Sequence, residues 1–356
     1  MLKRMVQAGV RRGLRQTRVR RLVEAQLARL QVPLMVENGT GQVFVDRYGV
    51  GHALDPSLRD RLKPGWRTML DPSQAARAPS VAELRSRAKR AADIVKETDR
   101  VVAAVTGTSL TGRILEIGCY DGAVAFQFAL REGTQVVASD LLRYYIVQQP
   151  GPPSHGDQQS QEAVAMLDGV RERTGLVAGI PSGRVRFVED DISASSLEPG
   201  SFDAIVSFEV LEHVASPRAA FASMARLLAP GGVAYHDYNP FFSVIGGHSL
   251  CTLDMAWGHA RLERVDFERY LVEVRPAEAD QALRFYLESL NRLALDDLRL
   301  AVAQAELELV ALLPWSDRAL VPDLTPQIVS EVQRAYPAAA AEDLLATFVS
   351  VVVRKP

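Results

Sequence analysis

The sequence predicts an α/β fold with a mostly parallel sheet of seven strands, helices on both faces and an antiparallel last strand. From residue 80 onwards, short apolar runs alternate with longer segments of helical periodicity, which is the order of strand–helix–strand units. Acidic or glycine-containing segments follow several of these runs, and parallel sheets bind ligands at the carboxyl ends of their strands. A glycine-bracketed turn after the first run indicates a place where a ligand approaches the backbone closely.

Residues 1–79 precede this pattern and are predicted to form a basic N-terminal extension. Residues 1–30 carry nine Lys and Arg side chains against the single acidic Glu24, and apolar residues recur among them at helical spacing. An amphipathic helix of this kind either docks on an anionic membrane surface or an acidic partner, or packs its apolar stripe on its own domain. The pattern alone leaves both interpretations open.

The rest of the extension is predicted to contain a hairpin and a connector. Residues 33–48 (PLMVENGTGQVFVDRY) are expected to turn at Asn38 and Gly39, a dipeptide typical of hairpins. Residues 49–79 are rich in Pro, Gly and Asp, so they are predicted to be an irregular connector.

A capping box marks the start of the core. Ser80 is followed three residues later by Glu83, which predicts a helix that begins here and ends at the segment 107–112. The run from Ile114 to Ile117 is short and apolar, as is typical of a buried parallel strand.

The turn after this strand is bracketed by Gly118 and Gly122 and leads into a helix over 123–130. Glycines suit such a turn because a side chain would keep a ligand away from the backbone amides. The spacing Glu-x-Gly-x-x-x-Gly differs from the Gly-x-Gly-x-x-Gly of dinucleotide sites, so a dinucleotide is not expected here.

Asp140 ends the second predicted strand, 135–139. A carboxylate at this strand tip accepts both ribose hydroxyls of a nucleoside held by the glycine turn, although an aspartate here also serves as a helix cap. The polar loop 148–160 is longer than a strand-to-helix connection needs. It is predicted to be a lid or a disordered insertion before a helix near 160–174.

The remaining elements continue the alternation. The third to seventh strands are expected at 185–188, 202–208, 233–236, 306–313 and 347–353, with helices at 217–228 and 293–305 and a turn at 230–232. The last strand follows the sixth after a long return, which favours an antiparallel pair at the edge of the sheet.

Residues 240–292 interrupt the alternation and are predicted to form a helical cap over the carboxyl ends of the strands. The segment leaves the core directly after the fifth strand, beside the expected site. Side chains suited to wall the site or to contact an acceptor are Phe241, Phe242, His248, Trp257 and His259. A second insertion spans 315–345.

Composition excludes several other classes of protein. The two cysteines, Cys119 and Cys251, form neither a disulfide framework nor a metal-ligand cluster, so no metal is expected. No run of 18 or more apolar residues exists, and residues at the N-terminus lack a secretory apolar segment. A cytoplasmic location is therefore expected, with peripheral membrane docking through residues 1–30 as the alternative. The chain beyond these residues is net acidic, so nucleic acid is not an expected partner.

Several motifs occur in order along the core. They are LEIGCYDG at 115–122, ASD at 138–140, EDDI at 189–192, FDAIVSFEVLEHV at 202–214 and LLAPGG at 227–232. With these motifs the chain resembles the class I S-adenosylmethionine-dependent methyltransferases, which have a Rossmann-like fold. It is most similar to the small-molecule group whose fourth strand ends in Leu-Glu-His. The resemblance implies a methyltransferase core over 80–239 and 293–356.

The resemblance also implies S-adenosylmethionine as the cofactor and a set of residues that bind it. Glu116, Gly118 and Gly122 would hold the methionine part, and Asp140 the ribose. The complete set of implied cofactor-binding residues is Glu116, Gly118, Cys119, Gly122, Asp140, Leu141, Asp191, Ile192 and Glu209. Within it, Asp191 and Ile192 would face the adenine, and Glu209 would line the methionine end.

The implied chemistry is an in-line displacement on the sulfonium methyl group, with a small-molecule hydroxyl as the expected acceptor. The protein must align the acceptor and remove its proton, for which histidine is the natural base. The candidate catalytic residues are His213, His236 and His248. His213 is the best placed, although a histidine at this position also serves to pack and hydrogen-bond beside the cofactor.

Two other classes of function stay open. A nucleic-acid or protein methyltransferase would dock through the basic residues 1–30. Enzymes that methylate base amines resemble one another in an Asn/Asp-Pro-Pro-Tyr/Phe at the fourth strand tip, whereas this tip reads Ser-Phe-Glu-Val. The second class is a non-catalytic protein that binds the cofactor.

Overall fold

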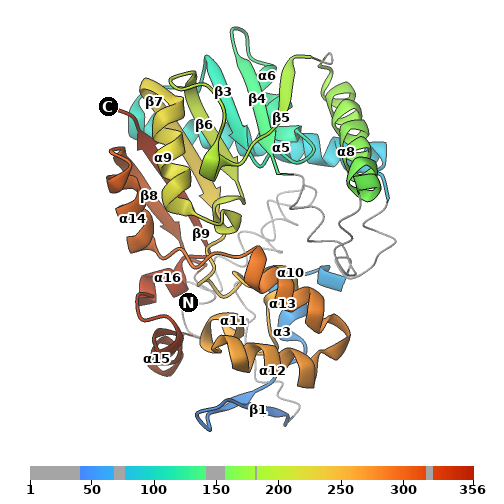
Figure 1. Ribbon diagram of the computed structural model, residues 1–356, viewed down its shortest axis with the longest axis vertical. Helices are drawn as coiled ribbons and strands as arrows, with labels where there is room; N and C mark the ends of the chain where they lie inside the picture. The colour runs from blue at the N-terminus through green and yellow to red at the C-terminus, as the bar shows by residue number, and fades with distance from the viewer. Residues whose placement is uncertain (1–40, 68–76, 142–156, 181–182, 318–323) are drawn as a thin grey trace, which may run out of the picture.

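The computed structural model describes residues 41–67, 77–141, 157–180, 183–317 and 324–356. The described chain forms a lobe built on a sheet and a smaller helical lobe beside it (Figure 1). The helix expected over residues 1–30, the turn at Asn38 and Gly39 and most of the loop 148–160 lie outside the described residues. No helix in the described part of the chain is both long enough and apolar enough to cross a membrane.

The sheet confirms the predicted seven strands and their directions. Its order is β5-β4-β3-β6-β7-β9-β8; the first five of these strands are parallel, and β9 runs antiparallel to both β7 and β8. The strands are β3 (Arg113–Ile117), β4 (Gln135–Asp140), β5 (Val185–Glu189), β6 (Phe202–Phe208), β7 (Leu228–Tyr238), β8 (Glu308–Trp315) and β9 (Phe348–Arg354).

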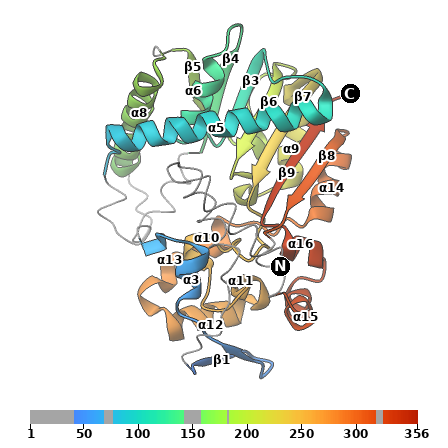
Figure 2. The same ribbon diagram turned by 180° about the vertical axis from the view of Figure 1, so that it is seen from behind.

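Helices cover both faces of this sheet, as expected (Figures 1 and 2). Alternate side chains of β3 show the two faces: Ile114 packs in the core under α5 and α6, and Leu115 packs in the core under α9 and α14. The helices of the first face are α5 (Val81–Thr106), α6 (Ala123–Ala129) and α8 (Asp157–Ala178). Those of the second are α9 (Pro217–Leu227) and α14 (Leu295–Gln304), with the short 3-10 helices η2 (Ile192–Ala194) and η3 (Leu211–His213) at strand ends.

The predicted capping box at the start of α5 is confirmed. The Glu83 amide donates to Ser80 Oγ at 3.3 Å, and the Ser80 amide donates to Glu83 Oε2 at 2.7 Å. Hydrogen bonds from Arg77 and then Ser80 lower the pKa of Glu83 to about 2. The helix ends at Gly107, whose φ of 73° is the left-handed conformation typical of a helix C-cap.

The connector expected at 49–79 is wrong in part, because it contains β2 (Gly51–Ala53) and α3 (Leu58–Leu62). Strand β2 pairs antiparallel with β1 (Val43–Val45) through a turn over residues 46–50. The Asp46 carboxylate accepts the amides of Tyr48 and Val50, both at 2.9 Å, and Gly49 has a φ of 77°. An aspartate that bonds the backbone two residues on is a turn signal of its own, and here it sets the hairpin.

Smaller shifts of boundary occur in the core. Strand β7 already begins at Leu228, so the turn expected at 230–232 is an irregularity within it; there Gly231 has a φ of 77° and donates its amide to Lys355 O. Strand β8 begins two residues later than expected, after Glu306 has taken a φ of 56°.

Residues 240–292 form the helical lobe together with residues 41–67 and the segment before β9. A single apolar core joins Phe44 and Leu58 of the extension, Phe241 and Trp257 of the cap, and Val332. The helices are α10 (His248–Cys251), α11 (Gly258–Arg261), α12 (Arg264–Val274), η4 (Pro276–Glu278), α13 (Ala279–Glu288), α15 (Pro326–Ala335) and α16 (Ala341–Leu345). The described part of the extension and the cap thus fold as one unit, although the sequence analysis treated them separately.

Candidate functional site

A pocket of about 390 Å³ lies at the carboxyl ends of β3, β4 and β6. Its volume is within the range of small-molecule sites, and its position is the one that parallel sheets use for ligands. The lining residues are Ile117, Gly118, Tyr120, Asp140, Leu141, Asp190, Asp191, Ile192, Phe208, Glu209, Val210, His213, Val214 and Ala215.

The glycine turn forms one wall of this pocket. Gly118 has a φ of 69°, and a Cβ atom there would overlap the side chain of Val210 on the facing loop. Its amide and that of Cys119 both donate to the Ser139 carbonyl, at 2.8 and 3.1 Å. Gly118 therefore allows two loops to meet at the pocket wall, while its amide is already engaged within the protein.

Three expected residues, Glu116, Cys119 and Gly122, are not among the residues that line the pocket. Gly122 begins α6 with a φ of 73°, and a Cβ atom there would lie 2.6 Å from Phe187 Cζ, so packing explains the glycine. Burial raises the pKa of the Cys119 thiol above its usual value. Burial and then the charges of Asp121 and Asp140 hold the pKa of the Glu116 carboxyl well above its usual range.

Asp140 is fixed at the pocket between β4 and the glycine turn. Its Oδ2 accepts the Tyr120 amide at 2.6 Å, and its Oδ1 accepts the Leu141 amide at 2.8 Å. A carboxylate oxygen has more than one acceptor position, so both oxygens are able to accept ligand hydroxyls as well.

Asp191 and Ile192 line the pocket after the end of β5. The Asp191 side chain caps η2 by accepting the Ser193 amide at 2.9 Å, which holds its carboxylate beside the pocket. The Ile192 side chain is buried and offers an apolar surface next to it.

Glu209 lies on the strained loop after β6. Its φ of 56° is unusual for a residue with a side chain, and its amide donates to Asp237 O at 2.7 Å. The loop continues into η3, which Asn291 holds in place through bonds from its side-chain amide to Leu211 O at 2.5 Å and Val214 O at 2.9 Å.

His213 lines the pocket, and His248 of the cap lies beside the His213 ring. His213 Nδ1 lies 2.6 Å from the Ser289 carbonyl, so this nitrogen carries the proton and donates it, which leaves Nε2 as the basic atom. Burial lowers the pKa of His213 to about 4, and the ring is therefore neutral at neutral pH. The ring of His248 lies 5.0 Å from it, centre to centre.

His236 and His259, by contrast, are packing residues. His236 is fully buried; its Nδ1 lies 2.7 Å from Ser207 Oγ, and its ring meets Phe221 edge-on. The His236 side chain packs between the sheet and α9 and does not line the pocket. The expected role as a base therefore does not suit its position. His259 donates from Nε2 to Phe241 O at 2.8 Å within the cap core.

Three residues at or near the site were missed by the sequence analysis. Tyr120 lines the pocket with 46% of its surface exposed, and its place inside the glycine turn was the signal that could have found it. Glu212 is fully buried; it accepts the Asn239 amide at 3.2 Å, and burial raises its pKa to about 8. Lys63 comes from the extension: burial lowers its pKa, and the nearby charges of Glu209 and Glu212 act in the opposite direction.

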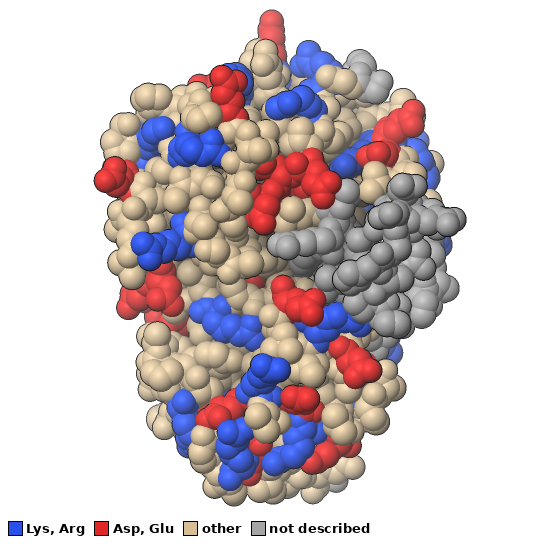
Figure 3. All heavy atoms as spheres, in the orientation of Figure 1, with Lys and Arg blue, Asp and Glu red and all other residues tan. Residues whose placement is uncertain are grey.

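The pocket lining is acidic. It contains the carboxylates of Asp140, Asp190, Asp191 and Glu209, and no Lys or Arg among the described residues that line it. Figure 3 shows acidic and basic side chains intermixed over the described surface on the drawn face. Such a pocket attracts a cationic ligand and repels phosphate groups.

Comparison with known proteins identifies a family. Residues 82–312 match the family model described as a methyltransferase domain. A ubiquinone biosynthesis O-methyltransferase from Xanthomonas oryzae pv. oryzae (strain PXO99A) is 34% identical over 120 residues, which cover 34% of this chain and 40% of that protein. The protein of the same name from Xylella fastidiosa (strain M23) is 35% identical over 126 residues, 35% of this chain and 41% of that protein. The match thus spans about two fifths of the length of these relatives.

Solved structures resemble the chain at low sequence identity. The structure of phosphoethanolamine N-methyltransferase 2 from Haemonchus contortus, in complex with S-adenosyl-L-methionine, aligns with a TM-score of 0.40 at 17% identity. The alignment covers 73% of this chain and 52% of that one.

Proposed function

The chain belongs to the S-adenosylmethionine-dependent class I methyltransferases, and from this premise we propose that it methylates a hydroxyl oxygen of a small molecule. The observation that carries the proposal is that Asp140 and the neutral His213 line one acidic pocket at the ends of the strands. The names of the curated relatives, which describe O-methyltransferases, support oxygen as the atom methylated.

The residues of the pocket fit the cofactor. The close approach of the loops at Gly118 shapes the wall for its methionine part, and Asp140 has acceptor positions for the two ribose hydroxyls. Asp191 and Ile192 combine an acceptor with an apolar surface, as an adenine ring requires. The acidic lining also favours a sulfonium cation electrostatically.

The bound cofactor supplies a methyl group on a positively charged sulfur. The acceptor oxygen would take this methyl group with one of its electron pairs, and a neutral thioether would be the leaving group. The hydroxyl proton has to leave as well. His213 is neutral and presents its basic Nε2, so it is the residue proposed to accept this proton.

The pKa of His213 also indicates which kind of hydroxyl group the site can deprotonate. A histidine whose pKa is about 4 is a weak base, and proton transfer to it is easiest from an acidic hydroxyl. A phenol, with a pKa of about 10, therefore fits the site better than an alkyl alcohol. The apolar Phe208 and Val214 in the lining suit an aromatic acceptor.

The other classes of function are less well supported by the pocket. Nucleic acid would bring phosphates to a lining with four carboxylates and no described basic residue. A purely structural role gives no reason for a strained Glu209 and a neutral histidine beside the same pocket. Docking of residues 1–30 on an anionic membrane surface stays a prediction.

The test is methyl transfer from labelled S-adenosylmethionine to matched panels of phenols, alkyl alcohols and amines. The proposal expects methyl ethers from phenols, formed together with an equal amount of S-adenosylhomocysteine. Transfer to amines alone would contradict oxygen as the acceptor atom, and cofactor binding without any transfer would favour the non-catalytic alternative.

A further inference from the structure

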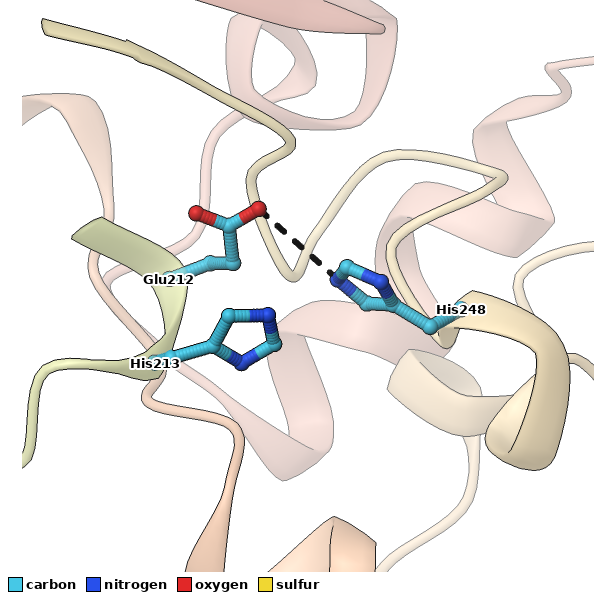
Figure 4. Close-up of side chains that lie close together, drawn as sticks. All are labelled: Glu212, His213 and His248. Atoms are coloured by element: carbon cyan, nitrogen blue, oxygen red, sulfur yellow. Dashed lines mark ion pairs between the residues drawn. The ribbon is translucent and has the colours of Figure 1, made fainter. Parts of the chain in front are cut away.

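Glu212, His213 and His248 form a cluster between the two lobes (Figure 4). Glu212 and His213 lie on η3, and His248 reaches them from the start of α10 in the cap (Figure 4). One potential ligand atom from each residue lies within 4.8 Å of the other two. Two imidazoles and a carboxylate are the ligand types that zinc and similar divalent ions take.

Two polar atoms of this cluster are buried without a hydrogen-bond partner among the described residues. They are His248 Nε2 and Glu212 Oε2, and the Glu212 side chain is fully buried. The other carboxylate oxygen, Glu212 Oε1, lies 3.9 Å from His248 Nε2, which is too far for a hydrogen bond. Buried polar atoms normally have partners, so a missing ion or ligand is a direct explanation for both atoms.

His213, the third residue of the cluster, is oriented as a metal ligand would be. The Ser289 carbonyl accepts the proton of His213 Nδ1 at 2.6 Å. In metal sites the ligating histidine almost always donates its other ring N–H to a carboxylate or carbonyl in this way, which fixes the tautomer and the ring. The same bond makes Nε2 the coordinating atom of His213.

The backbone around His248 is held in a costly conformation. His248 has a φ of 52°, which is rare for a residue with a side chain. The preceding Gly247 has no room for a Cβ atom, which would lie 2.6 Å from the Cys251 carbonyl carbon. Strain of this kind persists at functional sites, and here it directs the imidazole of the cap toward η3.

We propose that Glu212, His213 and His248 bind one divalent transition-metal ion of the zinc class. An ion with bonds of about 2.0–2.2 Å in a tetrahedral site holds its ligand atoms about 3.4 Å apart. The 3.9 Å between Glu212 Oε1 and His248 Nε2 is close to this value. All three ligand atoms lie within 4.8 Å of one another, so side-chain rotation has to shorten no spacing by more than roughly 1.4 Å.

A three-ligand site leaves a fourth position open, as catalytic zinc sites do. His213 lines the pocket, so an open position on that side of the ion would face an acceptor bound there. There the ion would bind the acceptor hydroxyl, lower its pKa and release its proton to water, and His213 would act as a ligand in place of a base. This role rests on the proposed function, whereas binding of the ion does not.

Binding is tested on the full chain after removal of metals with a chelator. Cobalt(II) is the probe, because it takes zinc sites and its visible absorption reports nitrogen and oxygen ligation. We expect one ion per chain, at least ten-fold weaker binding in Glu212→Gln and in His248→Ala, and competition by zinc. His259→Gln is the matched control, because it alters a buried histidine of the same cap that is not a ligand; it should bind cobalt as the unaltered protein does.

The unfolding temperature of the unaltered protein, with and without zinc, is a second measure of metal binding that does not depend on whether the variants fold. A ligand that binds only the folded state raises the unfolding temperature, so zinc should stabilise the stripped protein and a chelator should reverse the effect. A folded, stripped protein that takes up no cobalt and gains no stability would overturn the site. Unchanged cobalt binding in both ligand variants would overturn it too.

Activity separates this inference from the proposed function. If the stripped protein binds S-adenosylmethionine but transfers methyl groups only after zinc is restored, methyl transfer to oxygen and the metal site are both supported, and His213 acts as a ligand and not as the base. Full transfer by the stripped protein would overturn the catalytic role of the ion and leave the proposed function standing. Lys63 offers a further check: it interacts electrostatically with Glu209 and Glu212, so Lys63→Met should tighten cobalt binding by removing a competing positive charge.

Discussion

The Nδ1 atom of His213 lies 2.6 Å from the carbonyl oxygen of Ser289, so the end of α13 in the helical lobe fixes a ring at the carboxyl end of β6. The bond joins the lobe that carries the cofactor motifs to the cap. The cap therefore acts on the pocket through His213, because the Ser289 carbonyl sets which nitrogen of this ring is the acceptor.

Asp140→Ala should weaken binding of S-adenosylmethionine. The carboxylate is held at the pocket by the amides of Tyr120 and Leu141 and is proposed to accept ribose hydroxyls. Hydrogen bonds to a charged group are worth roughly 1.5–3 kcal/mol, which is the expected loss in calorimetry. Asp93→Ala, which alters an exposed carboxylate on α5, is the control. Equal affinities of the two variants for S-adenosylmethionine would show that Asp140 does not bind the cofactor.

A comparison of Gly118→Ala with Gly133→Ala separates the effect of backbone strain from that of the close contact at the pocket wall. Both glycines have left-handed φ values, 69° and 73°, so at both positions the backbone conformation alone should cost alanine about 1–2 kcal/mol in urea unfolding. At residue 118 the added methyl group also overlaps Val210, whereas nothing lies within 4 Å at residue 133. We expect only Gly118→Ala to impair cofactor binding. Comparable cofactor affinity in both variants would refute the close contact at the pocket wall.

Arg59→Ala should destabilise the protein by about 3–5 kcal/mol, because it leaves the buried Glu278 carboxylate with no closer cation than Arg275 Nε at 3.9 Å. Arg59 donates to Glu278 Oε1 at 2.6 Å and to Oε2 at 2.8 Å, which ties the extension to the cap. Arg67→Ala removes the exposed pair with Asp60 and should cost far less, because solvent screens this pair. Urea unfolding of both variants gives the comparison, and similar losses would mean that the extension is not anchored by the buried pair.

Stability should fall as the pH rises from about 4 to about 6, in part because of Asp237. Burial and then the charge of Glu209 raise its pKa to about 6 in the folded protein, above the usual 3.8. The folded state therefore holds this proton more tightly than the unfolded state, and the stabilisation of up to about 3 kcal/mol at low pH is lost above the folded pKa. Asp237→Asn should flatten the pH profile of unfolding. An unchanged profile would show that this carboxyl does not titrate abnormally.

The core of the fold was predictable because its signals are local. The apolar run from Ile114 to Ile117, the capping box at Ser80 and the aspartate at the tip of β4 each involve neighbouring residues. The alternation of strands and helices then determines a parallel sheet and places Asp140, Asp191 and Glu209 at the same edge. Six of the nine expected cofactor-binding residues line the pocket for this reason.

The rest of the site depends on contacts that the sequence does not display. His248 meets Glu212 across 36 positions of the chain, and Arg59 meets Glu278 across 219. Neither pair has a spacing that a helix or strand imposes, so no periodic pattern reveals them. The direction of the His236 side chain was equally hidden, because it depends on which face of β7 that residue occupies.

The most direct test of the account is methyl transfer to a phenol, measured in the unaltered protein and in His213→Ala by mass spectrometry of the methylated acceptor. The account predicts a methyl ether formed together with S-adenosylhomocysteine. It also predicts a loss of at least about a hundred-fold in the variant, which should still bind the cofactor. Methylation of a nitrogen, or a variant that forms the ether as fast as the unaltered protein, would contradict it.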